Sequence, residues 1–310
     1  MKRIRFIGFD NLADTINELK GAYGRISIIS GGTNFTVAKN RPDPDWIVDL
    51  SRVQDLQFII EDDNFIRIGA GTTFAEIASH HAVRTRIAAL AEAAGQIGSA
   101  QIRNRATIGG NIACASPAAD SIPVLAVYDA QIVTVGPEGS RTLLVREVIA
   151  NACQSTLGEK EIIKEIVFPV NSSRLSAFRK IGRRTTVTRS RLNMAALFEY
   201  CEKEDTILNG RIVLGAVGPF SVFPQRVSDY LRGCRVNKAF AKELSGLMTE
   251  IVNEINPAAK SRSYKVAAVE DCDRCGWCLD DRESRAYKAS AVRGLVYDIA
   301  THLFGDRFEL

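Results

Sequence analysis

The chain has 310 residues, 46% of them hydrophobic, and a formal net charge of +4 at pH 7. This length and apolar content support a sizeable core divided into two or three domains. The mild positive charge does not favour a nucleic-acid-binding protein, which normally concentrates a stronger basic excess on one face. No apolar run approaches the roughly 20 residues that span a bilayer, and no signal-peptide segment follows the charged start. We therefore expect a cytoplasmic protein whose seven cysteines are thiols or metal ligands rather than disulfides.

The first part of the chain, residues 1 to about 55, is predicted to form a β-α-β unit. Asn11 is a suitable N-cap for a helix that extends to Gly21. The apolar runs Ile26–Ile29 and Trp46–Leu50 have the character of short buried strands.

A second unit, residues 56–172, is predicted to mix strands and helices. A hairpin turns at Asp62–Asn64, and Thr73–Glu76 has the form of a capping box that begins a helix. The other predicted elements are apolar segments: the hairpin strands Leu56–Glu61 and Phe65–Ala70, helices Ile87–Ile97 and Ile122–Tyr128, and strands Gln131–Val135 and Ile162–Val167.

Pro169–Ser173 is the predicted linker to a third part, residues 173–310, because Pro, Asn and Ser favour turns. The pattern there predicts antiparallel strands followed by helices, which gives the whole chain an α+β fold. The predicted segments are strands Met194–Glu202 and Arg211–Val217, turns at Lys203–Asp205 and Asn209–Gly210, and helices Val227–Leu231, Ala239–Ile255 and Ser284–Leu303.

Two glycine motifs are the most informative feature of the sequence. Ser30–Asn34 and Thr107–Asn111 each contain a Gly-Gly pair, flanked by a small hydroxyl residue and followed by Asn. Glycine permits positive φ and lets backbone N–H groups approach a ligand with no Cβ in the way. Consecutive N–H groups in such a turn form a concavity that suits phosphate oxygens. The matched pair therefore predicts that a diphosphate is held from both sides.

The segments Ile29–Asn34, Ile102–Asn111 and Ala115–Asp120 resemble the flavin-binding motifs of the molybdenum hydroxylases. The similarity is to their separate FAD-binding medium subunit, as in xanthine dehydrogenase and carbon monoxide dehydrogenase. It continues in Ile66–Thr73, Glu161–Ile163, Phe178–Lys180 and Asp281–Lys288. The resemblance implies a two-part FAD-binding fold of the vanillyl-alcohol-oxidase and CO-dehydrogenase flavoprotein type over residues 1–172, and a C-terminal antiparallel sheet with helices over 173–310.

The resemblance also implies which residues contact FAD. They are Ile28, Ile29, Ser30, Gly31, Gly32, Thr33, Asn34, Phe35, Ile97, Thr107, Gly110, Asn111, Asp120, Ile162 and Lys180. Three of them have an alternative interpretation from the residues themselves. Asp120 has the form of an N-cap for the helix that follows it, and Ile97 and Ile162 are equally suited to be ordinary core residues.

Lys180 matches a lysine that reaches the flavin in this family, where a cation stabilises the negative charge of the reduced ring. It lies in a basic stretch with no acid between Arg174 and Arg191. That stretch is interpreted either as a solvated face or as a surface that attracts a pyridine nucleotide or an acidic partner. Relatives usually carry Asp where this chain has Thr188, which leaves the charge balance of the stretch and NAD as electron acceptor open.

The C-x2-C-x2-C spacing of Cys272, Cys275 and Cys278 is the second chemical motif, in an apparent insertion at about residues 257–280. This spacing is typical of ligands to an iron–sulfur cluster, and a [4Fe–4S] cluster is the prediction. Structural zinc and three idle thiols are the alternatives. A fourth ligand is missing locally. Candidates are Cys234 and Cys201 in the same predicted domain, a partner subunit's ligand or a non-cysteine ligand.

The function that the resemblance implies is an FAD-binding electron-transfer subunit. It would take electrons from [2Fe–2S] clusters of a small partner subunit, work beside a large molybdopterin-binding subunit, and pass electrons to an acceptor such as NAD. No nucleophile–base arrangement and no molybdenum-cofactor motif are visible, so no catalytic residue is assigned. The alternatives are a non-catalytic assembly module with a zinc-binding cysteine loop and a stand-alone flavin oxidoreductase.

Overall fold

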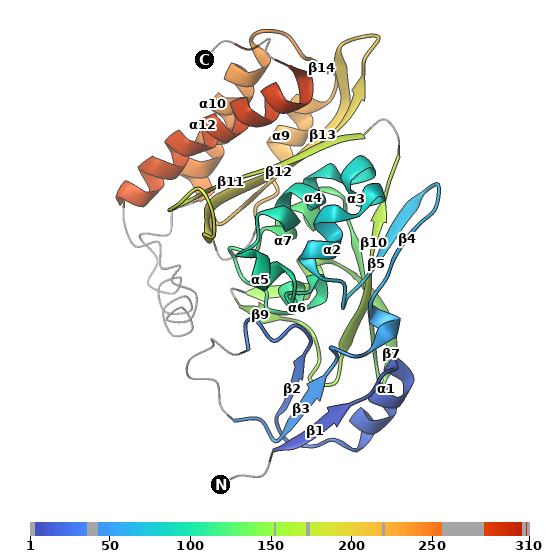
Figure 1. Cartoon of the computed structure of the whole chain (residues 1–310). Coiled ribbons are helices and arrows are strands. Elements are labelled where there is room, and N and C mark those ends of the chain that lie inside the picture. Colours follow the sequence, from blue (N-terminus) through green and yellow to red (C-terminus); the bar gives the residue numbers. More distant parts are fainter. Residues whose placement is uncertain are drawn as a thin grey trace.

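The computed structural model describes residues 4–35, 43–151, 153–171, 174–218, 221–255, 282–305 and 308. Within these ranges the strands form sheets of three, five and four strands and one two-stranded ribbon. Helices pack against the sheets (Figure 1). The protein therefore has the α+β fold that the sequence predicts.

The N-terminal unit is a parallel sheet in the order β1-β3-β2 beside one helix. Its elements are β1 (Arg5–Gly8), α1 (Leu12–Gly21), β2 (Ile26–Ile29) and β3 (Trp46–Asp49). The predicted N-cap is confirmed, because the Asn11 side chain accepts a hydrogen bond from the N–H of Asp14. Leu19 is fully buried on the inner face of α1. Since β2 is an edge strand and ends at Ile29, the first glycine motif begins directly after it, at the edge of the sheet.

The second unit is built on an antiparallel sheet in the order β4-β5-β10-β6-β7. Its strands are β4 (Ile59–Glu61), β5 (Phe65–Gly69), β6 (Gln131–Gly136), β7 (Gly139–Leu144) and β10 (Ile162–Pro169), preceded by a short 3-10 helix, Gln54–Leu56. Its helices are α2 (Phe74–Ser79), α3 (His81–Arg86), α4 (Ala88–Gly95), α5 (Ala100–Arg103), α6 (Ile108–Ala113), α7 (Ser121–Val127) and α8 (Val145–Val148). The ribbon consists of β8 (Ile149–Asn151) and β9 (Gln154–Ser155). The helices and sheet enclose the largest apolar cluster of the described residues, around Phe74 and Phe168.

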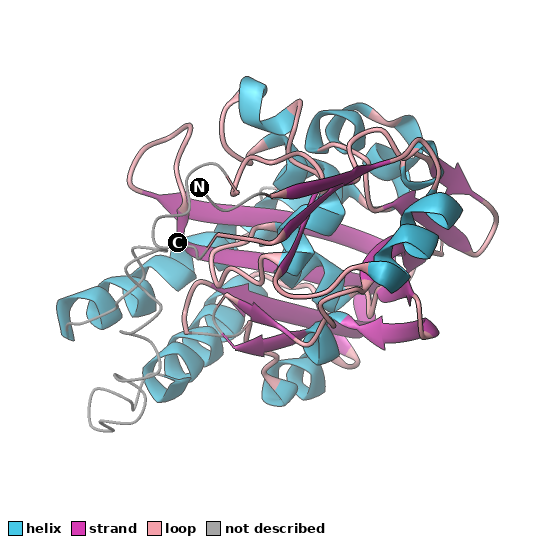
Figure 2. Cartoon of the chain, turned by 90° about the horizontal axis from the view of Figure 1, so that it is seen from below, coloured by secondary structure: helices cyan, strands magenta, loops and turns pink. Residues whose placement is uncertain are grey.

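The C-terminal unit is an antiparallel sheet in the order β11-β12-β13-β14. Its elements are β11 (Arg174–Gly182), β12 (Ser190–Cys201), β13 (Thr206–Gly215), α9 (Gln225–Leu231), β14 (Cys234–Arg235), α10 (Phe240–Ile255) and α12 (Arg282–Phe304). α12 packs against β11 and β12 and against α10, while α4 and α7 of the second unit contact the same strands. The long strands therefore lie between two sets of helices, as the view from below also shows (Figure 2).

One sequence prediction in this region was wrong, and one strand was missed. The Asn209–Gly210 pair does not form a turn but lies inside β13, paired with Glu199 and Phe198 of β12. A Cβ atom on Gly210 would approach side-chain atoms of Leu231 and Phe198 to 2.9 Å, so the glycine serves close packing. The basic stretch from Arg174 also forms a strand, β11, that no predicted element covered. The domain boundary near residue 172 stays a prediction.

Among the helices that the structure describes, none has both the length and the apolar character required to cross a membrane.

Candidate functional site

The first glycine motif lies against the segment that precedes the second. A Cβ atom on Gly31 would be 1.8 Å from the carbonyl oxygen of Arg105, so only glycine allows this close approach. Gly32 is required for another reason, since its φ is +70°. A Cβ atom there would meet no atom within 4 Å. Gly31 therefore allows the first motif to pack against the segment before the second, while space is left open beside Gly32.

The open side of the first motif has the properties of an anion cradle. The N–H groups of Gly31 and Thr33 donate to no acceptor among the residues that the structure describes. Free backbone N–H groups in a glycine turn attract phosphate oxygens. Because Gly32 carries no side chain into the open space, the residues present fit a diphosphate.

The second glycine motif is the start of helix α6 rather than an open turn. The hydroxyl of Thr107, its N-cap, accepts a hydrogen bond of 3.2 Å from the N–H of Gly110. The N–H groups of Ile108 and Gly109 donate to carbonyl oxygens in the loop between β5 and α2, at 3.1 and 2.9 Å. Since these three amides have protein partners, the prediction of an amide cradle on both sides was wrong for this motif. These three N–H groups are therefore not available to a ligand in this arrangement.

The two matched asparagines hold the site together. Asn34 donates from its side chain to the sulfur of Cys114 at 3.1 Å, which links the first motif to the end of α6. Asn111 accepts a hydrogen bond of 2.6 Å from the hydroxyl of Ser121, which links the second motif to α7. Both asparagines thus have a structural role in addition to any contact with a ligand.

Asp120 and Lys180, both predicted to contact FAD, form a buried ion pair. Lys180 Nζ lies 2.7 Å from Asp120 Oδ2, and each side chain is 6% exposed. The other carboxylate oxygen, Oδ1, accepts hydrogen bonds from Ser190 Oγ at 2.5 Å and Asn193 Nδ2 at 2.9 Å. Asp120 occupies the N-cap position of α7, but its side chain makes no capping hydrogen bond. The predicted N-cap position is confirmed, but the carboxylate serves the contact with the C-terminal sheet instead of capping the helix.

The ammonium group of Lys180 already has three acceptors, which equals its three N–H donors. Besides Asp120, these are the carbonyl oxygens of Gln96 at 2.8 Å and Thr188 at 3.4 Å. The bond to Thr188 is the longest and weakest of the three. A ligand that contacts this ammonium group must therefore replace that bond first.

Ser190 and Asn193 contact the ion pair although the sequence did not point to them, and they are 1% and 0% exposed. Asn193 Oδ1 is buried without a hydrogen-bond partner in the described part of the chain. An unsatisfied buried acceptor costs about 1–3 kcal/mol, so Asn193 is a poor choice for stability alone. It fits because it faces Gly215, where a Cβ atom would lie 2.1 Å from Oδ1. The available signal was the polar residues Ser190, Arg191 and Asn193 at the start of the otherwise apolar run that forms β12.

The two isoleucines predicted outside the glycine motifs lie in the core. Ile97 is partly buried against the cluster of the second unit, in the turn after α4. Ile162 is 1% exposed and belongs to the cluster of the N-terminal unit. Both positions agree with the interpretation of these isoleucines as core residues. Contact with a cofactor stays a prediction for both.

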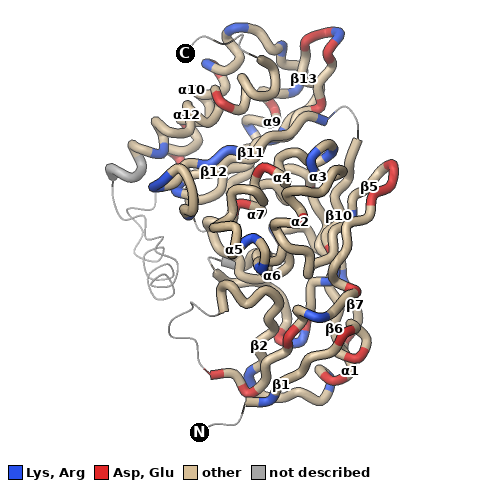
Figure 3. The backbone as a smooth tube through the Cα atoms, viewed as in Figure 1, with Lys and Arg blue, Asp and Glu red and all other residues tan. Residues whose placement is uncertain are grey.

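The basic stretch is partly neutralised by acids distant in sequence. Its paired members and their acids are Arg174 with Glu199, Arg179 with Glu92 and Asp298, and Lys180 with Asp120. Arg183, Arg184 and Arg189 are exposed in the β11–β12 connection, and Lys and Arg residues gather along β11 and β12 (Figure 3). The hydroxyl of Thr188 accepts a 3.1 Å hydrogen bond from the N–H of Arg183. The uncharged threonine side chain thus stabilises the β11–β12 connection.

The predicted metal ligands Cys272, Cys275 and Cys278 lie outside the described residues. Among the residues that are described, no group of three His, Cys, Asp or Glu side chains is arranged to hold a metal ion. Cys201 and Cys234, the candidate fourth ligands, are partly buried in the C-terminal sheet.

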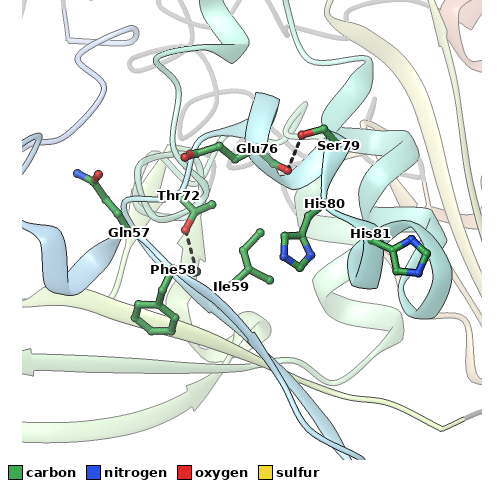
Figure 4. A pocket seen from close by; sticks show the side chains of 8 residues that line it. All are labelled: Gln57, Phe58, Ile59, Thr72, Glu76, Ser79, His80 and His81. Carbon is green, nitrogen blue, oxygen red and sulfur yellow. Dashed lines mark hydrogen bonds between the residues drawn. The ribbon is translucent and has the colours of Figure 1, made fainter.

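A surface groove of about 530 Å³ lies between the segment leading into β4 and helix α2 (Figure 4). None of the fifteen residues predicted to contact FAD lines it. The hydroxyls of Thr72 and Ser79 in its wall both donate to backbone carbonyl oxygens. Neither hydroxyl is therefore paired with His80 or His81, and the lining contains no activated nucleophile.

The geometry above is an α+β fold with an open glycine motif that fits a diphosphate, and comparisons with known proteins agree with it. A family model described as the FAD binding domain in molybdopterin dehydrogenase matches residues 4–171. The chain belongs to this family and is a subunit of the dehydrogenases of the molybdenum hydroxylase class.

Two relatives illustrate the similarity. The nicotinate dehydrogenase FAD-subunit of Eubacterium barkeri is 32% identical over 184 residues, which cover 56% of this chain and 62% of that protein. The aligned part thus spans slightly less than two thirds of that relative. The xanthine dehydrogenase FAD-binding subunit of Escherichia coli O157:H7 is 26% identical over 260 residues, covering 82% of this chain and 87% of that one.

The fold is that of a solved carbon monoxide dehydrogenase chain from Hydrogenophaga pseudoflava. The TM-score is 0.78 at 23% identity, over 96% of this chain and 95% of the other. The likeness covers the C-terminal sheet as well as the part that the family model matches.

Proposed function

We propose that this chain is the FAD-binding electron-transfer subunit of a multi-subunit molybdenum hydroxylase. In this proposal, electrons arrive from [2Fe–2S] clusters of a partner and leave to an acceptor such as NAD. Bound FAD supplies the capacity to accept two electrons and release them again. The observation that carries the proposal is the first glycine motif, where Gly32 at φ +70° faces open space beside the second motif.

The residues of the chain have distinct tasks in this proposal. The free N–H groups of Gly31 and Thr33 bind the diphosphate, and the contact of Gly31 with Arg105 fixes the distance between the motifs. Lys180 presents its positive charge where reduction leaves negative charge on the ring, an attraction that is strong where water is scarce. The 3.4 Å hydrogen bond to the Thr188 carbonyl is the weakest that the ammonium group makes, so Lys180 would give up this bond to contact the ring.

The proposed partners are a large molybdopterin-binding subunit and a small [2Fe–2S] subunit. Names such as "medium chain" and "FAD-subunit" among the relatives support an assembly of several chains. The organic substrate binds to the large partner in this proposal. Co-expression with the two partners and co-purification of all three chains tests the assembly.

The first prediction is that the purified full chain binds about one FAD and is yellow. The measurement is the flavin absorption of protein freed of unbound FAD by gel filtration. A preparation that stays colourless after incubation with FAD contradicts the proposed function. It would favour the alternative of a non-catalytic assembly module.

The second prediction concerns the cysteine motif, for which we propose a [4Fe–4S] cluster on its spacing alone. Cys275→Ser is expected to remove iron and broad visible absorption while FAD remains bound, because all predicted FAD residues precede residue 181. Iron, sulfide, zinc and flavin are measured on anaerobically purified protein. Zinc without sulfide favours the structural zinc site, and absence of both metals from the wild type excludes a metal site within this chain alone.

A further inference from the structure

The Asp120 carboxylate is held entirely by residues of the C-terminal sheet. Its hydrogen-bond partners Lys180, Ser190 and Asn193 lie on β11 and β12, whereas Asp120 itself precedes α7 of the second unit. Lys180 and Asn193 are direct cross-strand partners, so their side chains point to the same face of the sheet. Two neighbouring strands thus present a cation and an amide donor to one carboxylate.

An irregularity in β12 adds the third partner. In a regular strand, side chains alternate between faces, and Ser190 and Asn193 would lie on opposite faces. The pairing of Ile181 with Leu192 is followed by that of Gly182 with Ser190, so Arg191 is an extra residue. This bulge reverses the alternation and turns the Ser190 hydroxyl toward Asp120. The serine therefore reaches the carboxylate only because the strand is interrupted there.

The orientation of the Asn193 amide follows from its surroundings. Its NH₂ group must face the Asp120 carboxylate, because the opposite orientation would place two oxygens together. Oδ1 then points toward Gly215 and has no partner among the described residues. The fold therefore leaves Oδ1 of Asn193 unsatisfied in the described part of the chain. The NH₂ group of the same side chain gives Asp120 a second neutral hydrogen-bond donor beside Ser190.

We propose that Ser190 and Asn193 are positioning residues for the flavin, which act through Asp120 on Lys180. Their two hydrogen bonds disperse the negative charge of the carboxylate and fix its direction. The ammonium group of Lys180 is thereby held at one place with more of its positive charge uncompensated. This inference rests on the proposed function, because it takes the flavin ring to lie beside Lys180. Its effect is to raise the reduction potential of the bound flavin.

The test measures the midpoint potential of FAD bound to the full-length chain. Ser190→Ala and Asn193→Leu each remove one donor, and each is expected to make the potential more negative. We expect at least a tenfold loss of preference for reduced over oxidised flavin, a shift of about 30 mV for a two-electron couple. Ser176→Ala is the matched control, since Ser176 is also buried in β11 and contacts Ala89 and Tyr128 rather than Asp120.

The outcomes separate this inference from the proposed function. If the wild type binds no FAD, the proposed function is wrong. If Ser190→Ala binds FAD with the wild-type potential, the inference is wrong and the proposed function stands. An equal shift in Ser176→Ala also overturns it, because the effect would then be structural. In an Asp120→Asn background, Ser190→Ala is expected to cause no further shift. The Ser190→Ala result decides the proposal even where Asn193→Leu or that background does not fold.

Discussion

Replacing Gly32 with valine is expected to abolish FAD binding while the C-terminal sheet remains folded. The φ of +70° disfavours a β-branched residue, at a cost of roughly 1–3 kcal/mol. The new side chain also enters the open space beside the first glycine motif, where nothing lies within 4 Å of a Cβ atom. Bound flavin per chain and the far-ultraviolet circular dichroism spectrum are the measurements.

Gly233→Val is the matched control for this variant. Gly233 has a φ of +75°, and a Cβ atom there would also meet nothing within 4 Å, but the residue lies between α9 and β14. The two variants therefore carry similar backbone strain, and only the one in the glycine motif is expected to lose FAD. Stoichiometric FAD in Gly32→Val would show that this motif does not face the cofactor.

The Asp120→Asn substitution is expected to lower the free energy of unfolding by about 3–5 kcal/mol, because it leaves the Lys180 ammonium group buried without its anion. Both side chains of the pair are only 6% exposed. The Asp120→Asn/Lys180→Met double variant is expected to lose less than the sum of the two single variants. Denaturant unfolding monitored by circular dichroism measures these differences.

An exposed ion pair provides the comparison for Asp120 and Lys180. Arg226 and Glu254 are 2.6 Å apart, with side chains that are 52% and 62% exposed. Glu254→Gln is expected to change the unfolding free energy by less than about 1 kcal/mol, because water screens such a pair. A similarly small loss in Asp120→Asn would mean that the buried pair does not couple the second unit to the C-terminal sheet.

Sequence reasoning succeeded where the determining contacts are local. The Asn11 N-cap and the Thr73–Glu76 capping box are both confirmed. Each depends on hydrogen bonds between residues three positions apart, so the sequence contains the whole interaction. The hairpin at Asp62–Asn64 was predictable for the same reason, because its two strands, β4 and β5, follow one another in the chain.

Sequence reasoning failed where distant residues decide. The Asn209–Gly210 pair is a turn signal by itself, but pairing with β12 and close packing on Leu231 make it part of a strand. The charges of β11 suggested a solvated face because their acids are far away in sequence. Glu92 and Asp120, for example, precede their basic partners by 87 and 60 residues.

The candidate site shows the same division between local and distant causes. The glycine motifs were located from the sequence, because Gly-Gly pairs with a hydroxyl neighbour are visible there. That the amides of Ile108 and Gly109 are occupied was not predictable, since their acceptors lie in the loop between β5 and α2. The role of Ser190 likewise depends on a bulge in β12 that no pattern of residues in the sequence predicts.

The position of the Asp120 partners in the chain determines when the site is complete during synthesis. Both glycine motifs and Asp120 leave the ribosome before Lys180, Ser190 and Asn193 do, and domains generally fold from the N-terminus onward. A nascent chain can therefore fold the first two units while its Asp120 carboxylate still lacks every partner that the structure gives it. Under the proposed function, the Lys180 side of the FAD site is therefore complete only in a chain that has been synthesised through β12.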